Sequence, residues 1–240
     1  MSKTRALNAE KLFSLSGVVP LGLFLVLHVM ANGRALVGEN AFTATFTRIR
    51  ATPGIVAIEI ALVFVPLAFH AAYGVWLVAK KRALATPSPY EPWLRAVHRA
   101  AGVVALAYIA YHLYEYSLHG ATPGATAGDY FTVLSARLST IAGGAPLRAM
   151  FYVLGVAAVA LHFAVGLWGF MVARKWFVAP RARRFAAAGA AVIGAALFLG
   201  ATNVVTYFAT GARLIGRDGP TPVEVDPTVC PAPSASSSSK

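Results

Sequence analysis

Five long apolar stretches dominate the pattern of hydrophobic and polar residues along this chain. They cover approximately Leu12–Ala31, Gly54–Ala79, Ala100–Leu118, Ala149–Ala173 and Phe185–Ala209. A helix needs about 20 predominantly apolar residues to cross the hydrocarbon core of a bilayer. The pattern therefore predicts an all-α fold, an integral membrane bundle of five transmembrane helices.

Polar segments with helix-breaking residues separate these stretches. The longest connection, residues 119–148, is rich in Gly, Ala and Thr, and we expect a short amphipathic helix within it. After Gly211 the chain carries five prolines and ends in a run of serines, a composition typical of disorder. We predict a single transmembrane domain over residues 1–211 and a disordered tail over residues 212–240.

The placement of charge adds an orientation to this picture. Only 12% of the residues are charged, about half the fraction usual in a soluble domain, although the formal net charge is +12. If the N-terminus is inside, thirteen basic residues lie in inner segments and seven in the outer loops and the start of the tail. The positive-inside rule then predicts an inner N-terminus and an outer C-terminus. Basic residues confined to short connections also argue against a nucleic-acid-binding surface.

Four of the six histidines lie well inside apolar stretches, each on a different predicted helix: His28, His70, His112 and His162. An ionisable side chain inside a membrane helix is costly and by default marks a functional site. The alternative for a single histidine is a neutral imidazole hydrogen-bonded to a neighbouring helix. Four histidines on four separate helices instead favour a set of ligands. We predict His98 to be a surface group or a haem-propionate contact, and we leave His98 and His119 outside the ligand set.

Depth in the membrane sorts the four histidines into two pairs. At the rise of an α-helix, His28 and His112 lie about 24 Å and about 18 Å from the inner ends of their helices. His70 and His162 lie about 24 Å and about 20 Å from the outer ends of theirs. Two facing histidines at one depth suit the iron of a haem, which predicts an outer and an inner haem site. A zinc ion would draw its ligands to one point, so two depths disfavour zinc, and Cys230, the only cysteine, excludes a thiolate cluster.

A weak internal repeat accompanies these histidines. The segment 70–76 recurs as 162–168, and Gly17-Val-Val in the first stretch has a counterpart in Gly102-Val-Val in the third. The first and third helices therefore look alike, as do the second and fourth. This repeat also suggests that the histidines work in two pairs.

Small and rigid residues flank the inner pair. Gly74 and Gly166 lie one turn beyond His70 and His162 on the same helix face, where a missing side chain leaves room for a flat macrocycle. Ordinary small-residue helix packing is the alternative. Pro66, one turn before His70, predicts a kink in the second helix.

Longer motifs surround the four histidines. They are Ser14–Pro20 before His28, Glu59–Pro66 before His70, Trp93–Gly102 leading to Tyr111–Glu115, and His162–Trp168. With these motifs the chain, from Leu12 to about Phe208, resembles the five-helix, di-haem cytochrome b subunits of succinate:menaquinone oxidoreductases and related fumarate reductases.

The resemblance implies two b-type haems, menaquinone as substrate, and a multi-pass protein of the bacterial inner membrane. It pairs the first helix with the third and the second with the fourth, as the depths do. It also implies two soluble partners at the inner face, a flavoprotein that oxidises succinate and an iron–sulfur protein. Electrons would pass from the iron–sulfur protein through the inner and then the outer haem to menaquinone. Succinate chemistry would stay on the flavoprotein, so no residue acting on succinate is expected here.

Quinone reduction also needs proton donors near the outer haem. Glu59, three turns outward of His70, and Glu115, three residues beyond His112, are the carboxylates best placed for this. We expect Glu59 to lie deeper, whereas Glu115 has the alternative of an interfacial residue in contact with water. Some related fumarate reductases carry a proton-conducting glutamate where this chain has Ala160, so that route is not expected here.

Two other functions fit part of the pattern. A di-haem cytochrome b of another dehydrogenase, such as a nitrate reductase or formate dehydrogenase, tends to concentrate its ligands on fewer helices. A haem-free, proton-coupled transporter would use the histidines as a proton relay. The sequence leaves open whether succinate is oxidised or fumarate reduced.

Overall fold

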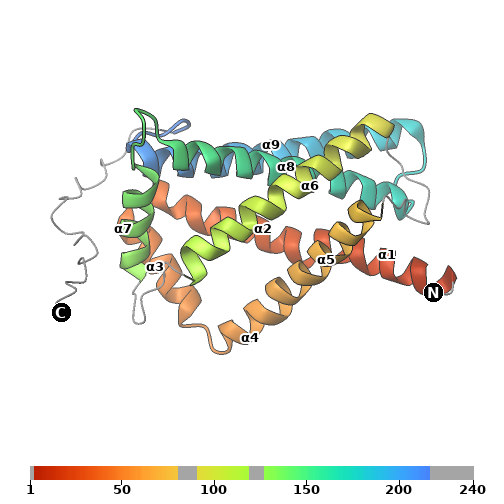
Figure 1. Ribbon diagram of the computed structural model, residues 1–240, viewed down its shortest axis with the longest axis horizontal. Coiled ribbons are helices and arrows are strands. Elements are labelled where there is room, and N and C mark those ends of the chain that lie inside the picture. Colours follow the sequence, from red (N-terminus) through yellow and green to blue (C-terminus); the bar gives the residue numbers. More distant parts are fainter. Residues whose placement is uncertain (1–2, 81–90, 119–126, 217–240) are drawn as a thin grey trace, which may run out of the picture.

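The computed structural model describes residues 3–80, 91–118 and 127–216, and within these ranges the chain is helical apart from turns and an isolated bridge between Ala142 and Ala145 (Figure 1). Five helical spans are long and apolar enough to cross a membrane: Leu7–Leu36, Ile55–Ala79, Pro92–Tyr116, Leu147–Ala173 and Pro180–Thr210. Each contains most of one apolar stretch found in the sequence. The predicted all-α bundle with five membrane spans is confirmed.

Proline divides the first span. Helix α1 (Lys3–Val18) ends where Pro20 begins α2 (Pro20–Gly33), and a short 3₁₀ turn, η1 (Arg34–Leu36), follows. Proline has no backbone N–H to donate and its ring crowds the preceding turn, so the regular ladder is interrupted there. Backbone bonds from Val19 to Leu15 and from Leu23 to Val19 carry the helix past the interruption.

The second span contains the irregularity predicted at Pro66. It begins with α4 (Ile55–Glu59), passes through a π-helical turn, η2 (Ile60–Phe64), and continues as α5 (Val65–Ala79). In a regular α-helix the ring of Pro66 would clash with the carbonyl one turn earlier. The wider π turn immediately before Pro66 absorbs that conflict.

The last three spans are nearly continuous helices. The third consists of α6 (Pro92–Leu113) and the π turn η3 (Tyr114–Leu118), and the other two are α8 (Leu147–Ala173) and α9 (Pro180–Thr210). Helix α6 begins two turns before the predicted apolar stretch, with Pro92 in its first turn, and these two turns include Arg95 and Arg99, which lower the local hydropathy. Gly211, at a φ of 74°, ends α9 in the left-handed conformation.

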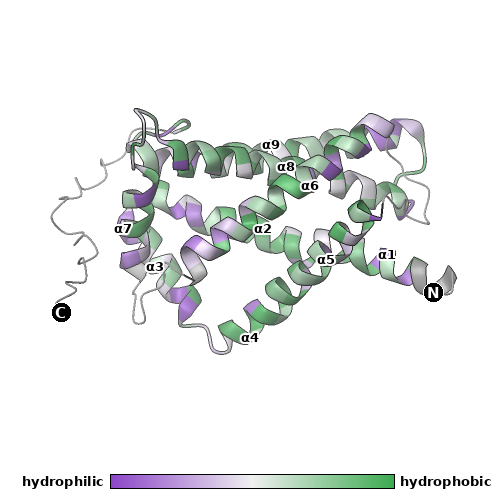
Figure 2. Ribbon diagram, in the orientation of Figure 1, coloured by the Kyte–Doolittle hydropathy of each residue, from purple (hydrophilic) through white to green (hydrophobic). Residues whose placement is uncertain are grey.

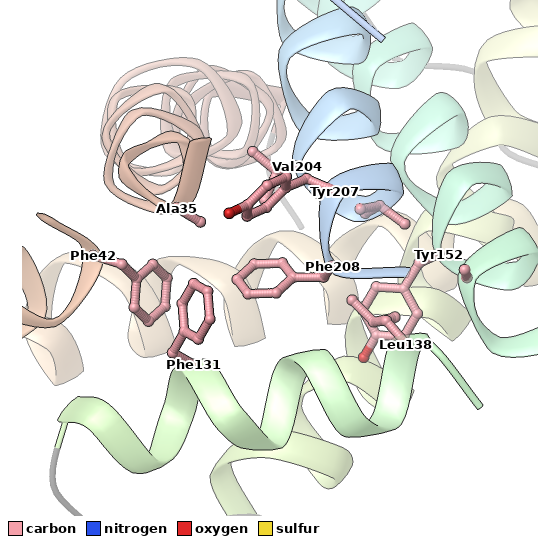
Figure 3. Packing of buried hydrophobic residues seen from close by; sticks show 10 residues of the cluster. Ala35, Phe42, Phe131, Leu138, Tyr152, Val204, Tyr207 and Phe208 are labelled. Atoms are coloured by element: carbon pink, nitrogen blue, oxygen red, sulfur yellow. The ribbon is translucent and has the colours of Figure 1, made fainter. Parts of the chain in front are cut away.

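Two short helices lie across the end of the bundle opposite the N-terminus (Figure 1). Helix α7 (Ala127–Leu138) is the amphipathic helix expected in the long outer connection, whereas α3 (Glu39–Arg50) was not predicted. Phe42 of α3, Phe131 of α7 and Phe208 of α9 meet there with ring centroids 5.2–5.9 Å apart (Figure 3). This buried aromatic cluster fixes both short helices to the bundle.

In Figure 2 the long helices are coloured mainly as hydrophobic residues, whereas the short helices α3 and α7 carry more hydrophilic ones. Large apolar residues such as Leu23, Leu62 and Val192 are exposed. A continuous exposed apolar surface of this kind marks contact with lipid.

The first residues of the predicted tail fold back on α9. Asn203, which is buried, accepts a hydrogen bond from the N–H of Leu214 at 2.7 Å and donates one to the carbonyl of Ile215 at 2.9 Å. The disorder predicted for the rest of the tail, together with Cys230 and His119, lies outside the described residues.

Candidate functional site

The four intramembrane histidines form two facing pairs. His70 of α5 faces His162 of α8, with ring centroids 6.2 Å apart and ring planes at 83°. His28 of α2 faces His112 of α6, with centroids 5.9 Å apart and planes at 86°. These pairings are the ones that helix depth predicted, and we keep the names that follow from the predicted orientation, inner pair for His70 and His162 and outer pair for His28 and His112.

The spacing within each pair tests whether a metal-centred group fits. A bond between a metal ion and an imidazole nitrogen is about 2 Å long, so two rings on opposite sides of one ion have centroids ~6 Å apart. The observed separations of 6.2 Å and 5.9 Å match this value. The ring separations therefore fit a metal-centred group such as a haem at each pair, which the two histidines of that pair would hold.

Hydrogen bonds to helix carbonyls orient the inner pair. The Nδ1–H of His70 donates to the carbonyl of Phe13 on α1 at 3.1 Å, and that of His162 donates to the carbonyl of His98 on α6 at 3.0 Å. A metal-binding histidine almost always gives its other ring N–H to such an acceptor. Both bonds leave the Nε2 lone pair free for a ligand.

Aromatic rings lie against the inner histidines. The ring of Phe13 stacks on His70 with centroids 4.4 Å apart, and the ring of His98 packs on His162 with centroids 4.2 Å apart. His98 is half-buried between helices, so its description as a surface group is wrong. Its contact with a haem propionate stays a prediction.

The outer pair has a different environment. Three tyrosine rings, those of Tyr108, Tyr116 and Tyr152, surround His112 at centroid distances of 5.4–5.9 Å. The Nδ1 atom of His112 is buried and has no hydrogen-bond partner among the described residues. An unpartnered buried nitrogen is costly in a protein interior and fits a site that a ligand completes.

Two glycines that sequence reasoning noted only as part of the repeat lie directly against the inner histidines. A Cβ atom added at Gly17 would lie 2.5 Å from Cε1 of His70, and one added at Gly102 would lie 2.7 Å from Cε1 of His162. A Cβ atom added at Gly74 would lie 3.7 Å from the ring of Phe13, and one added at Gly166 would lie 3.5 Å from Nε2 of His98, both ordinary contact distances. The role of Gly74 and Gly166 beside a macrocycle stays a prediction.

The structure buries Glu115, for which contact with water was the alternative, more fully than Glu59. Glu115 is only 5% exposed and accepts a 2.6 Å hydrogen bond from the hydroxyl of Tyr152. Arg148 lies 3.2 Å and Arg137 3.8 Å from the same carboxylate. Glu59 has a side chain 30% exposed and an ion pair at 3.4 Å with the exposed Arg50. Arg137 belongs to α7, which folds over the end of α6, so the burial of Glu115 depends on tertiary structure.

A comparison with curated proteins finds a relative that covers most of the chain. The chain is 33% identical over 185 residues to the succinate dehydrogenase cytochrome b558 subunit of Bacillus subtilis (strain 168), covering 77% of this chain and 88% of the relative. The chain belongs to the succinate dehydrogenase cytochrome b558 family. No protein-family profile matches the chain, and no solved structure matches it.

Membership of the cytochrome b558 family confirms the resemblance drawn from the motifs around the histidines. In this family member, the end of the bundle nearer the inner histidine pair carries exposed basic residues, among them Arg99, Lys175 and Arg181. These side chains leave a positively charged face outside the apolar surface. Such a face suits both the positive-inside rule and contact with a soluble partner.

Proposed function

We propose that this chain is the di-haem membrane anchor of a succinate dehydrogenase, which passes electrons from an iron–sulfur subunit to menaquinone. The observation that carries the proposal is the presence of two histidine pairs with ring separations of 6.2 Å and 5.9 Å. Each pair joins two different helices, and the pairs lie in opposite halves of the bundle. A single metal site or a proton relay does not require this paired spacing.

The ligand roles follow from the contacts of each histidine. His70 and His162 would hold the inner haem through Nε2, because their Nδ1–H groups are bound to carbonyls. His28 and His112 would hold the outer haem. When bound, the two haems supply one-electron redox chemistry, and the protein supplies ligation, orientation and electrostatics.

Protons for the quinone would come from the outer end of the bundle. The ring of Tyr152 lies against His112, and its hydroxyl donates a hydrogen bond to Glu115. Tyr152 therefore connects the outer site to a buried carboxylate. Glu59 remains the second candidate, next to Arg50. If Glu115 serves the quinone, Glu115→Gln slows quinone reduction by succinate while haem reduction persists, and Glu59→Gln leaves the rate unchanged. The opposite pattern would assign the role to Glu59.

The partners and orientation belong to the same proposal. A flavoprotein subunit and an iron–sulfur subunit would bind the inner face, where the exposed basic residues lie. The N-terminus would then be cytoplasmic and the C-terminus outside the inner membrane of a bacterium. Reduction of the haems by succinate in membranes containing the whole complex would separate this function from that of another dehydrogenase.

The decisive experiment is a reduced-minus-oxidised visible spectrum of the purified protein, with haem per chain measured as the pyridine haemochrome. Two b-type haems per chain would support the proposal. One haem would contradict the paired assignment, and none in a folded preparation would favour the haem-free transporter. His70→Ala and His28→Ala should each remove a different one of the two haems.

A further inference from the structure

The same backbone arrangement occurs twice around the inner histidine pair. On α1, the carbonyl of Phe13 accepts the Nδ1–H of His70, and Gly17 follows four residues later. On α6, the carbonyl of His98 accepts the Nδ1–H of His162, and Gly102 follows four residues later. The two acceptor helices, α1 and α6, correspond to each other in the internal repeat. Both inner histidines are therefore held by the same arrangement of a carbonyl and a glycine four residues later.

Helix geometry explains why a glycine belongs at this spacing. In an α-helix the carbonyl of one residue accepts the N–H of the residue four positions later, and its oxygen keeps a second lone pair. A side chain at that later position points back towards the carbonyl and takes up space that an aromatic ring from another helix needs in order to reach it. With glycine there, a side chain of another helix can approach the backbone closely.

The distances from a Cβ atom added at each glycine show how closely each imidazole approaches the helix backbone. A Cβ atom at Gly17 would lie 2.9 Å from Nδ1 of His70, and one at Gly102 would lie 2.9 Å from Nδ1 of His162. Both values are below an ordinary van der Waals contact. Each ring therefore occupies the space that an alanine methyl group would take.

We propose that Gly17 and Gly102 are positioning residues for the inner histidine pair. By leaving the carbonyls of Phe13 and His98 open, they place each Nδ1–H on a helix backbone and turn each Nε2 towards the partner histidine. This inference rests on the proposed function in one respect, that the inner pair holds a haem.

The first test replaces each glycine by alanine in the full-length protein. Gly17→Ala and Gly102→Ala should each lower the haem content from about two per chain towards about one, or shift the midpoint potential and the electron paramagnetic resonance signal of one haem. The other haem should keep its wild-type signal. Gly189→Ala is the matched control, because a Cβ at this helical glycine meets nothing within 4 Å. Wild-type haem content, potentials and resonance signals in both variants would overturn the proposal.

The second test does not depend on haem and so separates this inference from the proposed function. Gly17→Ala should lower the temperature of thermal unfolding when His70 is present. In a His70→Ala background the same change should have little effect, because the clashing ring is gone. Equal destabilisation in both backgrounds would refute the positioning role. Absence of haem from the wild-type protein would instead refute the proposed function.

Discussion

Replacing Tyr152 by phenylalanine removes one hydroxyl from a buried ionic network, and we expect it to destabilise the protein by about 1.5–3 kcal/mol. The hydroxyl donates to the carboxylate of Glu115 at 2.6 Å, the length of a charge-assisted hydrogen bond. Glu115 is 5% exposed, so water cannot replace the lost donor easily. The two arginines beside the carboxylate remain, and no buried charge is left unpaired. The cost therefore stays in the range of a hydrogen bond to a charged group.

Removing the carboxylate itself should cost more. Glu115→Ala takes the common acceptor from Tyr152, Arg137 and Arg148, and losing one partner of a buried ion pair typically costs about 3–5 kcal/mol. The side chains of Arg137 and Arg148 are 29% and 35% exposed, so water compensates for part of the loss. We expect a value near the lower end, about 3 kcal/mol.

The double variant tests whether the two changes share one interaction. With Glu115 already replaced by alanine, Tyr152→Phe should add little, which corresponds to a coupling energy of about 1.5–3 kcal/mol. Unfolding by sodium dodecyl sulfate in mixed micelles, followed by the circular dichroism of the helices, measures each free energy of unfolding. Tyr111→Phe is the control, because the contacts of this neighbouring tyrosine within the described part of the chain are ring contacts, to Phe151 and Tyr152. Additive effects, or a Tyr152→Phe value within 0.5 kcal/mol of wild type, would refute the reasoning.

Three further predictions concern the outer end of the bundle. Phe208→Ala should lower the free energy of unfolding by about 3–5 kcal/mol, measured in the same detergent titration, because the ring is 4% exposed within the aromatic cluster. Asn203→Ala should speed tryptic cleavage after Arg213 about fivefold or more, since the bonds holding Leu214 and Ile215 are lost; an unchanged rate would contradict this. Cys230, the only cysteine, should react with a membrane-impermeant maleimide in intact spheroplasts, whereas labelling solely after lysis would reverse the proposed orientation.

The sequence predicted the five spans well because length and hydropathy decide whether a helix can cross a bilayer. The inner turns of α6 were missed because Arg95 and Arg99 lower the hydropathy of a segment that is nevertheless helical. Helix α3 was missed for another reason. It is short and polar on average, and tertiary contacts such as those of Phe42 with Phe131 and Phe208 hold it in place.

The histidine pairs were predictable because a constant helical rise converts position in the chain into depth in the membrane. The contacts around them were not predictable in this way. His70 and the carbonyl of Phe13 are 57 residues apart in sequence, and their meeting depends on how α1 and α5 are rotated against each other. The difference in burial between Glu59 and Glu115 has the same origin, since Arg137 of α7 lies beside Glu115 and no residue of α7 lies beside Glu59 among the described contacts.

Helices α1 and α6, which correspond in the repeat, share the carbonyl and the glycine four residues later but not the side chains around them. Phe13 in one half corresponds to His98 in the other, and Ser16 corresponds to the buried Ala101. The Ser16 hydroxyl donates to the carbonyl of Phe13 at 2.8 Å, so this carbonyl serves two side chains. Ala101 has no hydroxyl to donate, and the carbonyl of His98 accepts the Nδ1–H of His162. Both helices keep the carbonyl and the glycine four residues later, so the orientation of the inner histidines depends on the backbone. The differing side chains give the two histidines unequal surroundings.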